Sequence, residues 1–416
     1  MKKLSKILLL LLVIFSLTAC GKNNHDQSTS KVQTKITKKT TIVFWHAMTG
    51  YRQNVLAKLT KEFEKENPKI NVKLQSQGTY PDLQAKVDAT LSSKKDLPNI
   101  TQAYPDGLID AEKNNYLVDL GPYLKNQKVD IASAFMKGAR INGKQYGLPF
   151  NKSVEVLFYN KTLLKKYGVK VPTTMAELKT AAETIYKKSK GKVVGAGFDS
   201  LSNYYMLALK NAGIDFSKNV DFTSQTSRKI INYYYQGVQK GYFRIAGTDK
   251  YLSYPFDNSK IAMFIGTSAT EGYIKMLGKK TLNYGVVLRP GKYTVGQGAD
   301  LYMLNKGNSN DKAASFLYMK FLTRKDSQLL WANSTGYLPV NNQALNNAKY
   351  LSSGYQVPLL ATKALKHTYS LPVVENSDNA YNELTPIFEN ILTAKPSKLE
   401  QMIQDGKTKL KNTWKD

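Results

Sequence analysis

The hydrophobic and polar residues of the chain repeat with two alternating periods, one typical of strands and the other of helices. Residues 40–48, TTIVFWHAM, combine β-branched and aromatic side chains and predict a strand. Residues 51–67 repeat an apolar residue every four positions and predict a helix. The same two periods then predict a strand at 70–77 and a helix at 80–93, and residues 99–107 predict a short strand that runs into a loop.

This order of strands and helices predicts an α/β domain, in which ligands bind beyond the carboxyl ends of the strands. His46, Tyr80 and Tyr104 stand at such ends, and we expect them to face one crevice. Neighbours on a strand point to opposite sides, so Trp45 is expected to pack in the core. About 375 residues follow residue 40, which is too many for a single core and enough for two domains.

The N-terminal residues have the plan of a secretory signal. A basic head containing Lys2, Lys3 and Lys6 precedes an apolar run at residues 7–17. This run is shorter than the roughly 20 residues that a membrane-spanning helix needs. We therefore predict that residues 1–19 are a signal peptide.

Cys20 is the only cysteine of the chain, so the fold cannot contain an intramolecular disulfide. It stands in LTACG, residues 17–21, which resembles the lipobox of bacterial lipoproteins. In that family the cysteine thiol carries a diacylglyceryl group, and the buried acyl chains hold the protein on a membrane. Residues 20–40 are rich in Lys, Asn, Gln, Ser and Thr and are expected to include this lipidated cysteine and a flexible linker.

The formal net charge of +29 becomes +26 once the three lysines of the signal are removed. Such a basic chain raises the possibility of nucleic-acid binding. However, the lysines are spread along the sequence, and only six of the 60 basic residues are arginine, the side chain preferred for phosphates and base edges. We expect a solvated lysine surface outside the cell and no nucleic-acid partner.

Three stretches of the chain resemble one protein family in their order and spacing. They are NGKQYGLPFNKSVEVLFYNKTLLKKYGVKVPTTMAEL at 142–178, FDNSKIAMFIGTSA at 256–269 and STGYLPV at 334–340. With the lipobox, they resemble the extracellular solute-binding proteins of bacterial ATP-driven importers, in the group of the maltodextrin- and glycerol-3-phosphate-binding proteins. The resemblance covers about residues 41–408.

Within this group the chain is most similar to the glycerol-3-phosphate-binding proteins, which share FWHxM at 44–48 and PFNxS at 149–153. The resemblance implies ligand contacts at Tyr80, Asp106, Ser153, Ser268, Gly298 and Tyr337, with His46 and Tyr104 as further candidates. The acidic residue of the family is displaced by one position here, to Asp106. The arginine near the family's C-terminus, which grips phosphate, has no counterpart after Arg324. This difference favours a glycerophosphodiester or a carbohydrate over glycerol-3-phosphate.

The resemblance implies a two-lobed, periplasmic-binding-protein-like α/β fold of type II, with the ligand between the lobes. The chain is expected to cross between the lobes three times, near residues 149–153, 296–300 and 341–349. The expected limits are 41–149 with 299–343 for lobe 1, and 153–296 with 347–416 for lobe 2.

The function implied is that of a monomeric substrate-binding lipoprotein, with neither catalytic activity nor a cofactor or metal. It would stand on the extracellular face of the cytoplasmic membrane and deliver a small solute to a permease and its ATPase. An exported hydrolase of glycans or phosphodiesters and a surface adhesin remain alternatives. The chain has no G-x-S-x-G or HExxH motif, and its histidines are isolated in sequence.

Overall fold

The computed structural model describes residues 32–93, 96–277 and 282–415 of the chain. The predicted signal peptide and Cys20 lie outside these residues. From Gln33 onward, the described residues form one compact unit. No helix in these three ranges is both long and apolar enough to cross a bilayer.

The first of two large sheets has five strands in the order β2-β1-β3-β13-β6. Strands β1, β2 and β3 run parallel, with Thr40 opposite Ile70 and Phe44 opposite Ile100, whereas β13 pairs antiparallel with both β3 and β6. The strands are β1 (Thr40–His46), β2 (Ile70–Ser76), β3 (Ile100–Ala103), β6 (Gly147–Pro149) and β13 (Asp300–Met303).

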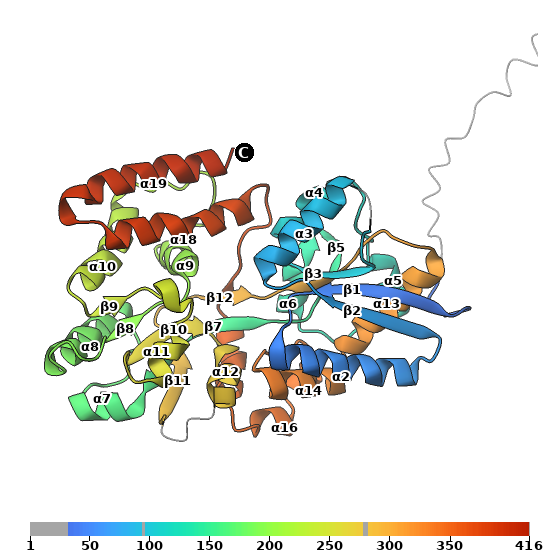
Figure 1. Ribbon diagram of the computed structural model, residues 1–416, viewed down its shortest axis with the longest axis horizontal. Helices are drawn as coiled ribbons and strands as arrows, with labels where there is room; N and C mark the ends of the chain where they lie inside the picture. The colour runs from blue at the N-terminus through green and yellow to red at the C-terminus, as the bar shows by residue number, and fades with distance from the viewer. Residues whose placement is uncertain (1–31, 94–95, 278–281, 416) are drawn as a thin grey trace, which may run out of the picture. The chain divides into compact units, whose positions relative to one another are not determined.

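Helices cover both faces of this sheet, with α13 on one side and α3 on the other (Figure 1). Phe44 packs edge-on against Tyr318 of α13, while its neighbour Trp45 faces the other way and joins a core cluster with Leu83 and Val87 of α3. The helices around this sheet are α2 (Gly50–Glu66), α3 (Tyr80–Ser93), α4 (Ile109–Lys113), α5 (Gly121–Asn126), α6 (Ser133–Gly138), α13 (Ser309–Leu322) and α14 (Lys325–Thr335).

The second sheet is built around β7, which pairs antiparallel with β10, β11 and β12. Seven of the eight residues of β7 are buried, and a short strand, β14, pairs in parallel with β12. The strands are β7 (Ser153–Asn160), β10 (Met263–Thr267), β11 (Tyr284–Leu288), β12 (Thr294–Gln297) and β14 (Thr368–Tyr369). Two small ribbons complete the strands, β4 (Arg140–Ile141) with β5 (Lys144–Gln145) and β8 (Ala196–Gly197) with β9 (Phe243–Arg244).

The larger hydrophobic core joins this second sheet to the helices beside it. Its rings include Tyr204, Phe243 and Phe388, which are almost fully buried. The remaining helices are α7 (Lys161–Tyr167), α8 (Met175–Lys188), α9 (Leu201–Asn211), α10 (Gln225–Gln239), α11 (Ser253–Asp257), α12 (Thr270–Leu277), α15 (Asn342–Leu345), α16 (Ala348–Leu351), α17 (Pro358–Leu365), α18 (Ser377–Thr393) and α19 (Leu399–Thr413), with short 3-10 turns at Asp106–Leu108, Gly247–Asp249 and Pro396–Lys398.

Two short segments connect the sheets, and they lie against each other. Residues 150–152 lead from β6 to β7, and residues 298–299 lead from β12 to β13. Asn151 N–H donates to the Ala299 carbonyl at 3.1 Å. Lys152 Nζ lies 2.5 Å from Asp300 Oδ1 and donates to the Gly298 carbonyl at 2.8 Å. These contacts hold the two connections together as one junction.

A third part of the chain meets the same junction through a helix end. Gly336 ends α14 in the left-handed conformation, with a φ of 80°. The turn brings Leu338 N–H to the Lys152 carbonyl at 2.8 Å. The adjacent Tyr337 stacks on Trp331, which is fully buried and stacks in turn on Phe150.

The architecture confirms the predicted α/β fold and the first five predicted elements. Strands β1, β2 and β3 and helices α2 and α3 begin and end within a few residues of the predicted limits, because their apolar periods are strong and each faces a core. The residue limits predicted for the two lobes stay a prediction.

Gly298 is the position at which the junction should tolerate no side chain. Its φ is 118°, and a Cβ there would lie 1.7 Å from the Asn151 carbonyl oxygen. Gly143 also has a positive φ, 79°, but a Cβ there would meet nothing within 4 Å. We expect Gly143→Ala to cost only the roughly 1–2 kcal/mol of a left-handed residue, and Gly298→Ala to cost clearly more. Urea unfolding of both variants measures the difference, and equal losses would show that the close approach is not a constraint.

Candidate functional site

A cavity of about 980 Å³ opens where the two sheets meet. Its wall combines the carboxyl end of β3, the start of α3, the end of β12 and the start of α18. The volume matches that of small-molecule sites, which are typically concave and few in a protein.

Two tyrosines form an aromatic corner of this cavity. Tyr80, the first residue of α3, and Tyr104, directly after β3, lie with ring centroids 5.5 Å apart in an edge-to-face arrangement. Asn151 Nδ2 donates to the Tyr80 hydroxyl at 3.0 Å, which ties this ring to the junction. Tyr104 keeps 37 % of its surface exposed and offers a ring face to a ligand.

The cavity is lined by three carboxylates and two ammonium groups among the described residues, Asp88, Asp106, Asp378, Lys137 and Lys152. Burial, and next the negative charge of Asp378, raise the pKa of the Asp106 carboxyl to about 7. Burial also raises the pKa values of Asp88 and Asp378. The acidic groups come from α3, the turn after β3 and α18, so they reach the cavity from separate elements.

The cationic groups of the lining offer little to a strongly charged anion. Lys152 is almost fully buried, and its ammonium group is committed to Asp300 and to the Gly298 carbonyl. Lys137 is exposed on α6. Arg52 is outside the lining, where its guanidinium lies over the rings of Tyr51 and Tyr337 and donates to the Ala269 carbonyl at 3.2 Å.

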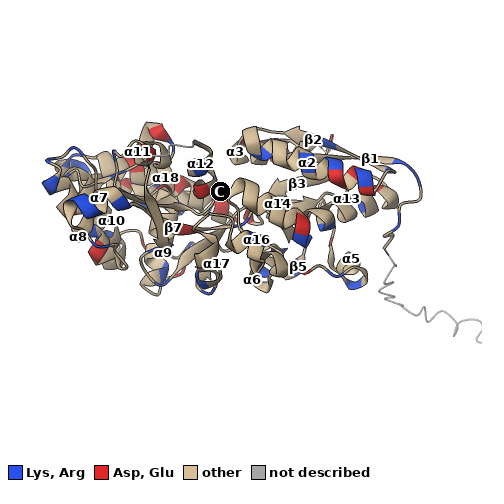
Figure 2. Ribbon diagram, turned by 90° about the horizontal axis from the view of Figure 1, so that it is seen from below, with Lys and Arg blue, Asp and Glu red and all other residues tan. Residues whose placement is uncertain are grey.

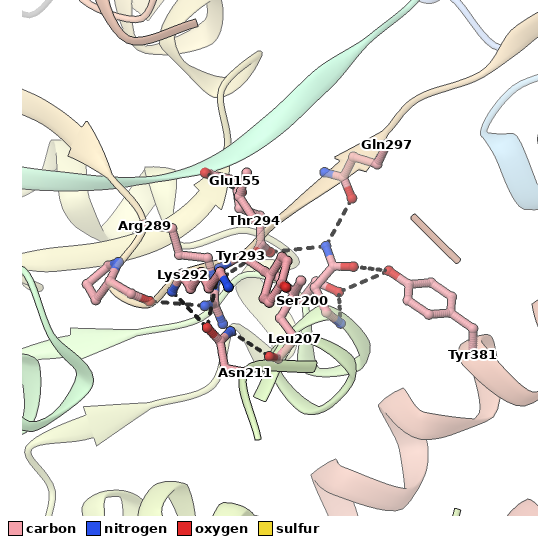
Figure 3. A network of polar contacts seen from close by, with 12 residues as sticks. Glu155, Ser200, Leu207, Asn211, Arg289, Lys292, Tyr293, Thr294, Gln297 and Tyr381 are labelled. Carbon is pink, nitrogen blue, oxygen red and sulfur yellow. Dashed lines mark hydrogen bonds and ion pairs between the residues drawn. The ribbon is translucent and has the colours of Figure 1, made fainter. Parts of the chain in front are cut away.

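A buried ion pair is linked to one wall of the cavity through Asn203, and Figure 3 shows the side chains of Glu155 and Arg289 in this network. Arg289 Nε donates to Glu155 Oε2 at 3.1 Å, and both side chains are only 2 % exposed. Burial raises the pKa of Glu155, and the adjacent guanidinium opposes that rise. The other carboxylate oxygen accepts a hydrogen bond from Asn203 Nδ2 at 3.0 Å. Asn203 in turn contacts Gln297 and Tyr381, both of which line the cavity.

Four of the residues predicted from the sequence line this cavity: Tyr80, Tyr104, Asp106 and Gly298. The other four are not among the lining residues. Ser153 is 2 % exposed and lies opposite Gln297 in the sheet. Ser268 is fully buried, and its hydroxyl accepts a hydrogen bond from Val154 N–H at 3.2 Å. Their role as ligand contacts stays a prediction.

His46 faces away from the cavity, whereas Tyr337 lies behind its lining with its hydroxyl beside that of Tyr80. His46 shares a strand face with Phe44, whose ring lies 5.6 Å away, and so faces the side that α13 covers. Met48 N–H donates to its Nδ1 at 3.2 Å, and burial lowers the His46 pKa to about 4. Tyr337 is 7 % exposed between Trp331 and the Arg52 guanidinium.

Sequence reasoning did not find Gln102, Gln297, Asp378 or Tyr381, which also line the cavity. Gln102 had a usable signal, because a glutamine inside the short apolar strand ITQA must have a buried polar partner. Asp378 and Tyr381 are three residues apart on α18 and therefore share a helix face, but nothing near them in sequence indicates what that face meets.

The basic residues do not gather around the cavity. Figure 2 shows Lys and Arg spread over helices beside both sheets, in agreement with the solvated lysine surface expected from the sequence. No group of three or more His, Cys, Asp or Glu side chains in residues 32–93, 96–277 and 282–415 is placed to hold a metal ion.

The profile of the family described as bacterial extracellular solute-binding protein matches residues 58–354. The sn-glycerol-3-phosphate-binding periplasmic protein UgpB of Escherichia coli K12 is 26 % identical over 336 residues, which cover 73 % of this chain and 75 % of that protein.

Solved structures of the same kind superpose over most of the chain. UgpB from Mycobacterium tuberculosis, in complex with glycerophosphocholine, has a TM-score of 0.79 at 19 % identity and covers 90 % of this chain and 98 % of its own. The GacH receptor of Streptomyces glaucescens, solved unliganded and with acarbose, has a TM-score of 0.78 at 21 % identity and covers 91 % and 100 %.

These structures confirm the two-lobed fold predicted from the sequence, and the family match spans more than half of the residues. The chain belongs to the bacterial extracellular solute-binding protein family.

Proposed function

We propose that the protein is the substrate-binding component of an ATP-driven importer and captures its solute by closure of two lobes. The observation that carries this proposal is the cavity, because its wall takes residues from both sides of the junction. A ligand that contacts both lobes binds the closed arrangement better than the open one and therefore shifts the population toward it.

The groups in the cavity favour a glycerophosphodiester or an oligosaccharide as the solute. Carboxylates accept hydrogen bonds from hydroxyl groups, and amides can both accept and donate them. Tyrosine rings pack against the apolar faces of sugars and glycerol. A phosphate monoester of charge near −2 would need paired cations to leave water. Lys152 is already paired, and the described lining contains no arginine.

The lipid anchor and the partners belong to the same proposal. The sequence around Cys20 has the pattern of a lipobox, so the mature protein would be anchored on the extracellular face of the cytoplasmic membrane. The closed, loaded form would then dock on a membrane permease driven by an ATPase. The protein itself would catalyse no reaction, as expected of a relative of solute-binding proteins.

Titration calorimetry with glycerophosphocholine, glycerol-3-phosphate and maltotriose tests the proposed solute classes. We expect one-to-one binding of the diester or the sugar to the purified protein, without turnover. Tyr80→Ala should weaken it about tenfold or more, because the ring loses its contact with the ligand. Tyr254→Ala, at an exposed tyrosine on α11, is the matched control. Submicromolar binding of glycerol-3-phosphate alone would reverse the ligand choice, and hydrolysis of a probe would favour the hydrolase alternative.

Small-angle X-ray scattering tests closure directly. Saturation with whichever probe binds in the calorimeter should reduce the radius of gyration, because the lobes approach each other around the ligand. The same titration of the Tyr80→Ala variant at a concentration too low for binding is the control. An unchanged radius on saturation of the unsubstituted protein would contradict capture by closure.

Lipidation can be followed in cells with labelled palmitate. We expect the label on the unsubstituted protein and its complete loss in Cys20→Ser, because the thiol that forms the bond to the lipid is gone. Ser30→Ala, in the predicted linker, should keep the label. Equal labelling of the Cys20→Ser variant would show that the anchor lies elsewhere.

A further inference from the structure

Two glutamine side chains in the cavity have their amide orientation fixed by the groups behind them. The first is Gln102, which is fully buried and lines the cavity. Ala47 N–H donates to its Oε1 at 3.0 Å, so the amide oxygen must face away from the cavity. Its Nε2 has no hydrogen-bond partner within the described ranges. An unpartnered buried donor of this kind is costly, and a ligand acceptor would satisfy it.

The second is Gln297, whose orientation follows from the buried ion pair. Arg289 stays charged and holds Glu155 in its ionised form, which can only accept hydrogen bonds. Asn203 must therefore turn its NH₂ group, and not its carbonyl oxygen, toward Glu155. The same Nδ2 donates to Gln297 Oε1 at 2.9 Å, while Asn203 Oδ1 accepts from the Tyr381 hydroxyl at 2.7 Å. Figure 3 labels Gln297 and Tyr381 and marks both of these hydrogen bonds with dashed lines. With its oxygen held, Gln297 has only its NH₂ left for the cavity.

The two amides therefore require a ligand group that is rich in acceptors. They are neutral donors, so they suit a singly charged or polar group better than a doubly charged one. Both lie close to the junction, since Gln297 directly precedes Gly298 in sequence and Gln102 lies opposite Leu301 of β13 in the sheet.

The opposite requirement comes from the acidic part of the lining. Asp106 follows β3, whereas Asp378 is in the first turn of α18, and Tyr104 and Tyr381 line the cavity with them. With Lys152 neutralised by Asp300, three carboxylates face a single exposed ammonium group, that of Lys137. A neutral ligand would leave this excess negative charge uncompensated when it displaces water, whereas a cation beside carboxylates and aromatic rings would balance it.

Resting on the proposed function of the cavity as the solute site, we propose that the solute is a zwitterionic phosphodiester. Its phosphate accepts hydrogen bonds from Gln102 and Gln297, and its quaternary or primary ammonium group lies between Asp106, Asp378 and the tyrosine rings. Asn203, Glu155 and Arg289 are positioning residues, because they set which end of the Gln297 amide meets the ligand.

Two diesters, one with a cationic and one with an uncharged alcohol group, give the decisive comparison in the calorimeter. Glycerophosphocholine and glycerophosphoglycerol share the glycerophosphate half, but only the first carries a positive charge. We expect glycerophosphocholine to bind the purified protein at least tenfold more tightly. Equal affinities, or a preference for maltotriose over both diesters, would overturn the inference and leave the solute-binding function intact. Absence of binding by every probe, together with no solute released from the denatured protein in mass spectrometry, would contradict the proposed function as well.

Isosteric variants locate the two ends of the ligand. Asp106→Asn and Asp378→Asn should each weaken glycerophosphocholine at least tenfold and change the affinity for glycerophosphoglycerol less than threefold. Gln297→Glu keeps an oxygen for Asn203 but presents a second one to the phosphate, so it should weaken both diesters at least tenfold. Asp405→Asn, at an exposed position on α19, is the matched control. Thermal unfolding shows whether each variant is folded, and folded variants that bind both probes normally would overturn the assignment.

The pH dependence of glycerophosphocholine binding tests whether Asp106 contacts the ligand cation. A purely structural role of Asp106 would not produce this dependence. Asp106 is faced by Asp378 from α18, by Asp300 from β13 and by Lys152 from the junction, and the pKa of its carboxyl lies at about 7. Protonation at lower pH removes the negative charge that the cation needs. Glycerophosphocholine should therefore bind about tenfold more weakly at pH 6 than at pH 8. The dependence should vanish in Asp106→Asn, and the same slope in that variant would overturn the role of Asp106.

Discussion

The buried pair of Glu155 and Arg289 is the interaction on which the cleft depends. Removing two charges from water is costly unless each is paired and its remaining hydrogen-bonding groups are satisfied. Here the second carboxylate oxygen is satisfied by Asn203, and the guanidinium also donates to the Pro290 carbonyl. The ion pair thus does more than link β7 to the segment before β12. It also sets the direction of the hydrogen bonds that Asn203 makes with Gln297 and Tyr381 in the wall of the cavity.

A second constraint acts where the chain passes between the sheets. The close approach of Gly298 to Asn151, and the ion pair of Lys152 with Asp300, make two connections behave as one. A hinge built in this way can turn only if both segments turn together. The same contacts occupy the ammonium group of Lys152, which pairs with Asp300 and donates to the Gly298 carbonyl. This cation is therefore not available to a ligand, although it lines the cavity.

The sequence predicted the local part of this structure well and the long-range part poorly. Strands and helices of the first sheet follow from apolar periods, and Tyr80, Tyr104 and Asp106 reach the cavity because they follow strand ends. His46 follows the same rule but faces α13, since strand parity places it beside Phe44. Asp378 could not be predicted, because its place opposite Asp106 depends on how α18 packs about 270 residues further along the chain. The orientation of the Gln297 amide likewise depends on Arg289, Glu155 and Asn203, which only the fold brings together.

The two amides and the two carboxylates proposed to hold the ligand are each divided between the two sides of the cavity, which is why we expect binding and closure to be one event. Gln102 and Asp106 belong to the first sheet and its loops, whereas Asp378 lies on α18 and Gln297 at the end of β12. Each side therefore presents one amide and one carboxylate, which is only half of the partners proposed for either charge of the ligand. In an open arrangement each charge of the ligand would keep part of its hydration. Half of the protein partners could not compensate for the free energy of removing these charges from water. In the proposed closed state the amides and the carboxylates act on the same molecule, so the ligand itself would supply the differential contacts that favour closure.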